Sequence, residues 1–136
     1  MNTVTRVRDA MVSEPISLDA AASAQEAGLR LSDPDVRAVL VCDDGALAGV
    51  ITRKTLVREI VAAGRDPAAT RLGEIAEPPV FTLDADAGLE QAFHELEARD
   101  LERVPVIEDG RLVGILSRAV VQRRLAEDEP PVEETV

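Results

Sequence analysis

Residues 39–53 read VLVCDDGALAGVITR, and residues 104–118 read VPVIEDGRLVGILSR. Each stretch contains an apolar run, an Asp-Gly turn, a second apolar run and a hydroxyl residue followed by arginine. An Asp-Gly pair supplies the positive φ angles that a tight hairpin turn needs. The two stretches therefore predict two antiparallel hairpins, each followed at once by a helix.

The two hairpins belong to a longer repeat. Residues 7–62 align with residues 72–127 at a constant offset of 65 and without a gap. A register held through strands, loops and turns indicates one supersecondary unit built twice. Each copy reads β-α-β-β-α, and neither is long enough to bury a good core alone. We expect an α/β (α+β) fold in which the two repeats pack face to face about a pseudo-twofold axis.

The repeat also sets the expected boundaries. We expect a first repeat at 1–64, a linker at 65–71, a second repeat at 72–127 and a disordered acidic tail at 128–136. Asp19 and Asp84 stand where the first helix of each repeat would be capped. The closing helices are expected at about 53–63 and 118–126.

Composition excludes several classes of protein. The net charge is −11, and Trp and Tyr are absent, so the chain lacks the basic surface and the stacking aromatics of nucleic-acid binders. No stretch has the length of a membrane span, and the N-terminus lacks the apolar core of a secretory signal. Cys42 is the only cysteine. These features predict a cytoplasmic protein without a nucleic-acid or membrane partner.

The sequence shows no catalytic or metal-binding set. His94 is the only histidine, with Glu90 and Glu97 nearby on the same expected helix, off its apolar stripe. One histidine with flexible carboxylates is a poor transition-metal site, so a solvated helix face is the better interpretation. No nucleophile and base can be paired around it. We expect no enzyme activity, no metal and no required cofactor.

Thr52 and Ser117 mark the candidate binding positions. Each ends an apolar strand and stands at the N-cap of the helix that follows, where free N–H groups and the helix dipole favour phosphate. Arg53 and Arg118 follow directly, and a guanidinium group binds phosphate well. Each hydroxyl is also an ordinary helix cap, and this second interpretation stays open.

The doubled motif, with an Asp-Gly hairpin and then strand-Gly-apolar-apolar-Thr/Ser, resembles a tandem cystathionine-β-synthase (CBS) domain pair, or Bateman module. The connector at 64–75 further resembles stand-alone actinobacterial members of the hypoxic-response type. In this family AMP, ADP, ATP or S-adenosylmethionine binds in the cleft between repeats, and modules pair into homodimeric discs. The resemblance implies a regulatory module that senses an adenosine nucleotide or a related ligand.

Family roles carry over onto particular positions. Thr52 and Ser117 match the phosphate-contacting hydroxyl, and Ile16 and Val80 match the position beside adenine. The remaining pocket positions lie in the segment before each hairpin: Ala38, Val39 and Leu40 in the first repeat, and Arg103, Val104 and Pro105 in the second.

The chain departs from the family three residues after the hydroxyl. Nucleotide binders of the family carry an Asp there for the ribose hydroxyls, whereas this chain has Thr55 and Val120. Thr55 could make one weaker bond and Val120 none, so binding should be weak and is expected around Thr52 and Thr55. The alternative is a ligand-free dimeric scaffold that binds a protein partner of unknown identity. A homodimer is expected in both cases.

Overall fold

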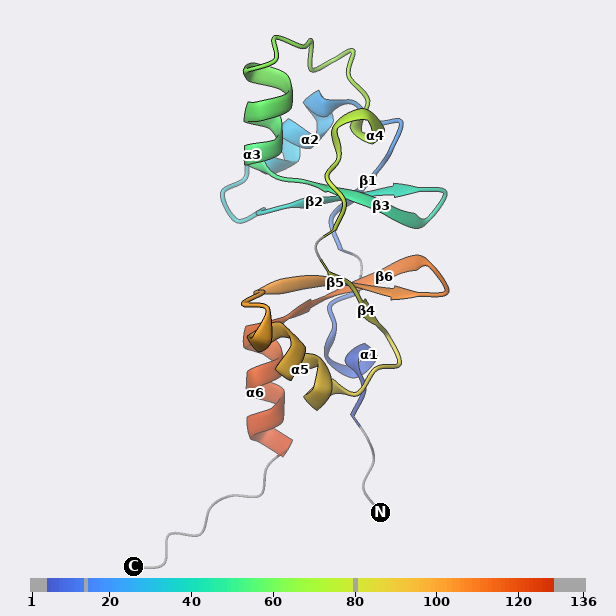
Figure 1. The fold of residues 1–136 in the computed structure, drawn as a ribbon, viewed down its shortest axis with the longest axis vertical. Coiled ribbons are helices and arrows are strands. Elements are labelled where there is room, and N and C mark those ends of the chain that lie inside the picture. The colour runs from blue at the N-terminus through green and yellow to red at the C-terminus, as the bar shows by residue number, and fades with distance from the viewer. Residues whose placement is uncertain (1–4, 14, 80, 129–136) are drawn as a thin grey trace, which may run out of the picture. The chain divides into compact units, whose positions relative to one another are not determined.

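The computed structural model describes residues 5–13, 15–79 and 81–128. The chain forms two compact units (Figure 1). The first-repeat unit contains residues 14–81 and 109–112, and the second-repeat unit contains residues 1–13, 82–108 and 113–136. Of the acidic tail expected at 128–136, residues 129–136 lie outside the described residues.

The first-repeat unit is a three-stranded sheet with its helices on one face (Figure 1). The parallel pair β1 and β2 is extended by β3, which runs antiparallel to β2. Its elements are β1 (Ser17–Asp19), α2 (Ala24–Leu31), β2 (Val39–Asp43), β3 (Ala46–Ile51), α3 (Arg53–Leu56), the π-helical segment η1 (Val57–Val61) and α4 (Leu72–Ile75). Small and branched side chains form its core: Ala24, Ala27, Leu31, Val39, Val41, Ile51, Ile60, Leu72 and Ile75.

The second-repeat unit follows the same order of elements. β4 pairs in parallel with β5, and β5 continues through a tight turn into β6. Its elements are α1 (Val7–Ala10), β4 (Leu83–Asp84), α5 (Leu89–Ala98), β5 (Arg103–Glu108), β6 (Arg111–Ser117) and α6 (Arg118–Asp128), with the turn residues 109–112 grouped with the first-repeat unit. The expected β-α-β-β-α order is therefore confirmed in both repeats.

The two Asp-Gly turns have the expected backbone. Asp44 and Gly45 have φ angles of 52° and 83°, and Asp109 and Gly110 have φ angles of 52° and 78°. Positive φ at both central residues is typical of the turns that join antiparallel strands. The hairpin predictions are confirmed.

Asp19 and Asp84 do not cap the helices, which corrects the sequence prediction. Asp19 Oδ1 accepts a hydrogen bond from Ala21 N at 2.8 Å, and Asp84 Oδ1 accepts one from Asp86 N at 2.8 Å. A short carboxylate bonding the amide two residues on forms a local turn. The helices begin later, after Ser23 and Gly88, and only Ser23 makes a side-chain cap.

The segments that open the two repeats are exchanged between the units. Val7 N donates to Ala87 O at 2.9 Å, while Leu72 N donates to Ala22 O at 2.9 Å. Helix α1 therefore lies in the second-repeat unit, and helix α4 lies in the first-repeat unit. The boundaries expected at 64 and 72 remain a prediction about the sequence repeats, because each compact unit combines residues of both.

The exchange continues along one strand edge in each unit. Val12 and Ile115 exchange two backbone hydrogen bonds of 2.8 and 3.0 Å, and Glu77 and Val50 do the same. The glycines beside these bridges allow the close approach. A Cβ on Gly49 would lie 2.7 Å from Ala76 Cβ, and one on Gly114 would lie 2.8 Å from Val12 O. Each opening segment is thus bonded to the residue next to a glycine, at a place where a Cβ would come too close to the segment.

Candidate functional site

Thr52 lies at the junction between β3 and α3, as the sequence predicts. Its backbone is extended, with φ −121° and ψ 174°, and α3 begins at the next residue. Thr52 Oγ1 accepts a hydrogen bond from Thr55 N at 3.3 Å. The side chain is only half-buried, so Thr52 caps the helix and still has a surface open to a ligand.

Thr55 is the partner of this cap and is fully buried. Its Oγ1 accepts from Thr52 N at 3.1 Å and lies 3.1 Å from Thr52 Oγ1. The two residues form a reciprocal capping box, in which each side chain bonds the backbone of the other. The hydroxyl that was expected to reach a ribose is therefore engaged inside the protein, and its direct role in binding remains a prediction.

Arg53 is bonded to the end of the preceding helix. One terminal nitrogen of its guanidinium group donates to Leu31 O at 2.6 Å and to Asp33 O at 2.8 Å. Carbonyl groups at a helix C-terminus lack partners within the helix, and a basic side chain can satisfy them. Arg53 thus connects the start of α3 to the end of α2, and its expected contact with phosphate remains a prediction.

Arg118 holds the equivalent place in the second-repeat unit. It donates to Asp100 Oδ1 at 3.3 Å and to a carboxylate oxygen of Glu102, while its backbone N–H donates to Glu102 O at 2.8 Å. Ser117, just before it, is half-buried at the end of β6. In both repeats the arginine after the hydroxyl residue bonds the region where helix α2 or α5 ends and the chain leads to the next strand.

The residues predicted to line the pocket differ in solvent exposure. Ile16 is 39% exposed and its carbonyl oxygen accepts from Leu40 N at 3.0 Å. In each repeat the segment before the hairpin is open at its first position and then buried: Ala38 is half-buried and Arg103 exposed, whereas Val39, Leu40, Val104 and Pro105 are buried. Val80 lies outside the described residues. Within the first-repeat unit, Ile16 and Arg53 are exposed and Ala38 and Thr52 are half-buried, so these four are the accessible ones among the expected contacts.

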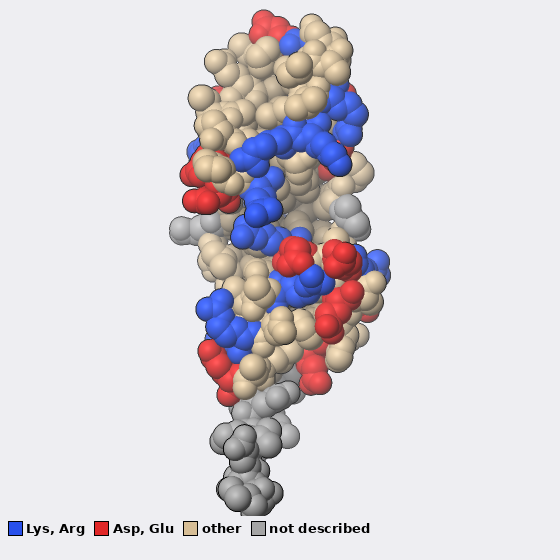
Figure 2. Space-filling model, turned by 90° about the vertical axis from the view of Figure 1, so that its left-hand side faces the viewer, with Lys and Arg blue, Asp and Glu red and all other residues tan. Residues whose placement is uncertain are grey.

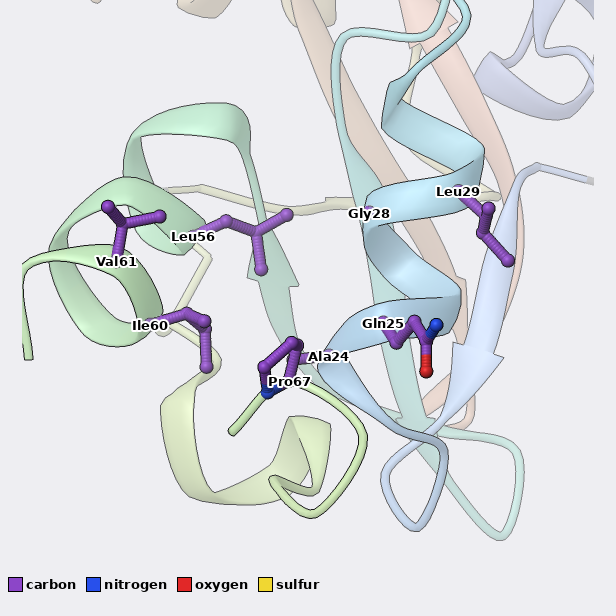
Figure 3. Close-up of a pocket in the computed structure, with 8 residues that line it drawn as sticks. All are labelled: Ala24, Gln25, Gly28, Leu29, Leu56, Ile60, Val61 and Pro67. Carbon is purple, nitrogen blue, oxygen red and sulfur yellow. The ribbon is translucent and has the colours of Figure 1, made fainter. Parts of the chain in front are cut away.

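Sequence reasoning missed a groove on the helices of the first-repeat unit. It is lined by Ala24, Gln25, Gly28, Leu29, Leu56, Ile60, Val61 and Pro67 (Figure 3). The apolar spacing of these helices is also typical of an ordinary core face, so periodicity could not reveal the groove. The difference in size between Gly28 and its counterpart Phe93 in the second repeat was the available signal.

Other chemistry-bearing residues are placed apart. Among the described residues, no group of three His, Cys, Asp or Glu side chains is arranged to hold a metal ion. His94 is exposed, and its Nδ1 lies 4.0 Å from Glu97 Oε1. Partial burial, with a smaller effect from Asp19, raises the pKa of the Cys42 thiol, which keeps it protonated and unreactive. None of the described helices is long and apolar enough to cross a membrane.

Comparison with known proteins identifies the repeated unit. A family model described as CBS domain matches residues 7–62 and again residues 72–127. Hypoxic response protein 1 of Mycobacterium tuberculosis is 36% identical over 98 residues, which cover 71% of this chain and 68% of that protein. The resemblance seen in the repeats is confirmed.

Solved structures agree on the fold. A crystal structure of Hypoxic Response Protein I, with two coordinated zinc ions, matches with a TM-score of 0.74 at 30% identity, covering 88% of this chain and 98% of that one. A crystal structure of CBSX2 in complex with AMP matches with a TM-score of 0.69 at 23% identity, covering 90% and 96%. The second likeness concerns the fold alone.

Proposed function

The chain belongs to the CBS-domain family, and from this premise we propose that it is a non-catalytic regulatory module that binds an adenosine nucleotide or a related small ligand. AMP, ADP, ATP and S-adenosylmethionine are the ligands proposed, and the working form is a homodimer in the cytoplasm. One observation carries the proposal. Thr52 is half-exposed at a strand-to-helix junction, where its hydroxyl and the first N–H groups of the helix are available to phosphate.

The engaged side chains around Thr52 set the strength of this binding. One terminal nitrogen of the Arg53 guanidinium group donates to two carbonyl oxygens at the end of α2, and the Thr55 hydroxyl is bonded to Thr52. A ligand would gain less from either residue than from a side chain without these bonds. A ribose hydroxyl that loses its partner in water costs about 1–3 kcal/mol. We therefore propose weak binding, in which Thr52 contacts the ligand and Thr55 is a positioning residue.

Regulation requires that the ligand favours one arrangement of the protein over another. In this proposal, a phosphate that accepts the proton of the Thr52 hydroxyl competes with Thr55 Oγ1, which lies 3.1 Å from Thr52 Oγ1, and so alters the first turn of α3. Helix η1 continues directly from α3 and carries exposed apolar side chains. Binding at the start of this helix would in this way reach a surface suited to a protein partner.

The scaffold alternative is favoured by a different observation. Val120, at the second-repeat position equivalent to Thr55, offers no hydrogen bond to a ribose. Arg118 is also bonded to Asp100 and Glu102. In this alternative the hydroxyl residues serve only as helix caps, and the protein acts by association.

Equilibrium dialysis with radiolabelled ATP and AMP tests the proposal, using the unaltered protein and two variants. Thr52→Val should abolish measurable binding, because it removes the hydroxyl without changing the side-chain size. In the second repeat, Val120→Asp should add a separate AMP site beside Ser117, since a carboxylate accepts strong bonds from ribose hydroxyls. The same variant should gain nothing for 2′,3′-dideoxy-AMP, which lacks both hydroxyls. Equal binding by the unaltered protein and Thr52→Val would refute the assignment of the site.

A further inference from the structure

A group of exposed cations in the first-repeat unit lacks carboxylate partners. The group lies at one end of the hairpin formed by β2 and β3, and Figure 2 shows a band of Lys and Arg side chains across one face of this unit. None of its members forms an ion pair with another described residue. We call the group the basic surface, and it consists of Arg30, Arg37, Arg53 and Lys54.

The backbone brings these side chains together. Val39 of β2 pairs with Ile51 of β3 at the end of the ladder, so Arg37 and Arg53 each lie two residues beyond the same pair. Arg53 donates to two carbonyl oxygens at the end of α2, at 2.6 and 2.8 Å, and Arg30 lies in the last turn of that helix. The fourth cation follows Arg53 directly in the first turn of α3. One helix end, one loop and one helix start therefore contribute to the same surface.

The positive charge of this surface is left uncompensated. The printed bonds of Arg53 go to carbonyl oxygens, which do not neutralise a guanidinium group. Asp33 and Asp35 lie in the same loop, but Asp33 Oδ1 accepts a hydrogen bond from Asp35 N at 2.9 Å. Elsewhere in this unit Arg58 is paired with Glu77. The basic surface thus keeps its charge available to a partner.

The second repeat has the opposite charge at the same positions. At the offset of 65, the four cations are replaced by two carboxylates, one arginine and one alanine: Glu95, Glu102, Arg118 and Ala119. Glu102 is paired with Arg118, and Glu95 is paired with Arg99. Both repeats nevertheless form the same order of elements. The basic surface is therefore not a requirement of the fold that the two repeats share.

Charge selects an anionic partner, and the spread of the cations selects an extended one. Since the four side chains come from three elements and are exposed, a single phosphate can meet only some of them. In an extended peptide, side chains two residues apart point to the same side about 7 Å from each other. Acidic residues at alternate positions of such a segment can therefore meet several separate cations at once.

A nucleic acid fits this surface less well than an acidic polypeptide does. A duplex carries one charge for about every 1.7 Å of its axis and needs a larger basic face than four side chains provide. Its next phosphates would meet Asp33 and Asp35, which are exposed beside the basic surface. A short acidic segment can end before it reaches them. Because most of a chain with net charge −11 repels an acidic partner, the basic surface also determines where that partner docks.

We propose that the basic surface is a docking site for an extended acidic segment of a partner protein. Arg30, Arg37 and Lys54 meet its carboxylates directly, and Arg53 adds the guanidinium N–H groups that the end of α2 does not occupy. The proposal goes beyond the nucleotide binding of the proposed function and does not depend on it.

Fluorescence polarisation of a labelled octaglutamate peptide with the full chain tests the proposal, in the absence of any nucleotide. The peptide should bind saturably at low salt, and the affinity should fall by about tenfold or more in about 0.3 M salt, because exposed charges are screened. Octaglutamine should not bind. Lys54→Glu and Arg37→Glu should each weaken binding by about tenfold, since each change removes an attraction and adds a repulsion of similar size.

Arg123→Glu is the matched control, because Arg123 is exposed on α6 and the change alters the net charge equally. It should change the affinity by less than about twofold. All three variants should keep the melting temperature of the unaltered protein within a few degrees, since the replaced side chains are exposed.

Four results would overturn the proposal. The first is an unaltered protein that does not bind octaglutamate at low salt. The second is an equal loss of binding in Arg123→Glu, which would show that net charge and not this surface attracts the peptide. The third is inorganic triphosphate that displaces the label at a lower concentration than unlabelled octaglutamate does, which would make the surface a small-anion site. The fourth is a change in the mass of the free protein on Lys54→Glu, measured by light scattering, which would mean that another copy already covers the surface.

Discussion

Thr52 and Thr55 hold each other at the start of α3. Thr55 N donates to Thr52 Oγ1 at 3.3 Å, and Thr52 N donates to Thr55 Oγ1 at 3.1 Å. The equivalent pair in the second repeat is Ser117 and Val120, in which only the first residue has a hydroxyl. The strongest candidate contact in the chain is therefore also part of a structural cap, and experiments must separate the two roles.

Comparing Thr52→Val with Ser23→Ala separates the capping role of Thr52 from its contact with a ligand. Both changes remove an N-cap in the first-repeat unit, because Ser23 Oγ accepts from Glu26 N at 3.2 Å. Each should lower the free energy of unfolding by about 1 kcal/mol, measured by urea denaturation. Only Thr52→Val should also reduce nucleotide binding. If Ser23→Ala reduces binding equally, the loss comes from stability and Thr52 has no contact of its own.

Gly49→Ala should destabilise the protein by more than about 2 kcal/mol. The added Cβ would lie 2.7 Å from Ala76 Cβ and 2.8 Å from Glu77 O, and neither neighbour is the end of a flexible side chain. The change would push the exchanged segment away from β3. Chemical denaturation measures the effect.

Gly28→Ala is the matched control and should have the opposite sign. Gly28 lies inside α2, and its new Cβ would make an ordinary 3.9 Å contact with Leu56 Cδ1. Replacing glycine by alanine within a helix gains about 0.5–1 kcal/mol. A stability loss at Gly28, or a gain at Gly49, would show that these backbone approaches are described wrongly.

Val7→Ala should loosen the second-repeat unit, although residue 7 belongs to the first repeat in the sequence. Val7 is fully buried in the second-repeat unit, and deleting two methyl groups there costs about 2 kcal/mol. In native-state hydrogen exchange, amides of α5 should gain more in rate than amides of α2. Leu72→Ala is the converse change and should affect α2 more than α5. If the same helix showed the larger increase in exchange rate in both variants, the exchange of the opening segments would be contradicted.

Asp86→Asn should reduce the loss of stability in acid. Hydrogen bonding to the Arg8 guanidinium group, opposed by partial desolvation, holds the pKa of the Asp86 carboxyl below its ordinary value near 3.8. A lowered pKa in the folded state gives stability that is present above the unfolded pKa and is lost as the pH falls through the folded pKa. The unaltered protein should have a higher urea midpoint than Asp86→Asn near neutral pH, and this difference should therefore disappear below about pH 4. Both groups are exposed, so the effect is small.

Glu90→Gln provides the control for this titration, because Glu90 is an exposed carboxylate in the same unit and has no bond to Arg8 among those described. Its midpoint should follow that of the unaltered protein across the acid range. A constant gap for Asp86→Asn at every pH would mean that the Arg8 pair does not stabilise the ionised carboxylate.

Local rules predicted the parts of the fold that depend on neighbouring residues. Asp44-Gly45 and Asp109-Gly110 form the expected turns because the backbone itself requires φ above zero there. Thr52 caps α3 because a hydroxyl residue that follows a strand can bond the first N–H groups of a helix. The prediction that Asp19 caps a helix was wrong for a similarly local reason, because its carboxylate accepts a hydrogen bond from the nearer amide of Ala21.

Long-range features could not be predicted from the sequence. The bridges between Val12 and Ile115 and between Glu77 and Val50 join residues far apart in the chain, and periodicity carries no information about such pairs. The bonds of Arg53 to Leu31 O and Asp33 O likewise depend on how two helices meet. The sequence predicts which groups can bind phosphate, but the fold decides which of them are already occupied.

Isothermal titration calorimetry of the unaltered protein against AMP, ADP, ATP, S-adenosylmethionine and NAD tests the central claim most directly. It suits a chain with no Trp or Tyr to report binding by fluorescence. The proposed function predicts saturable binding of at least one adenosine ligand, with the heat lost in Thr52→Val. A folded dimer that releases no heat with any of the five ligands at millimolar concentration would contradict it and support the scaffold.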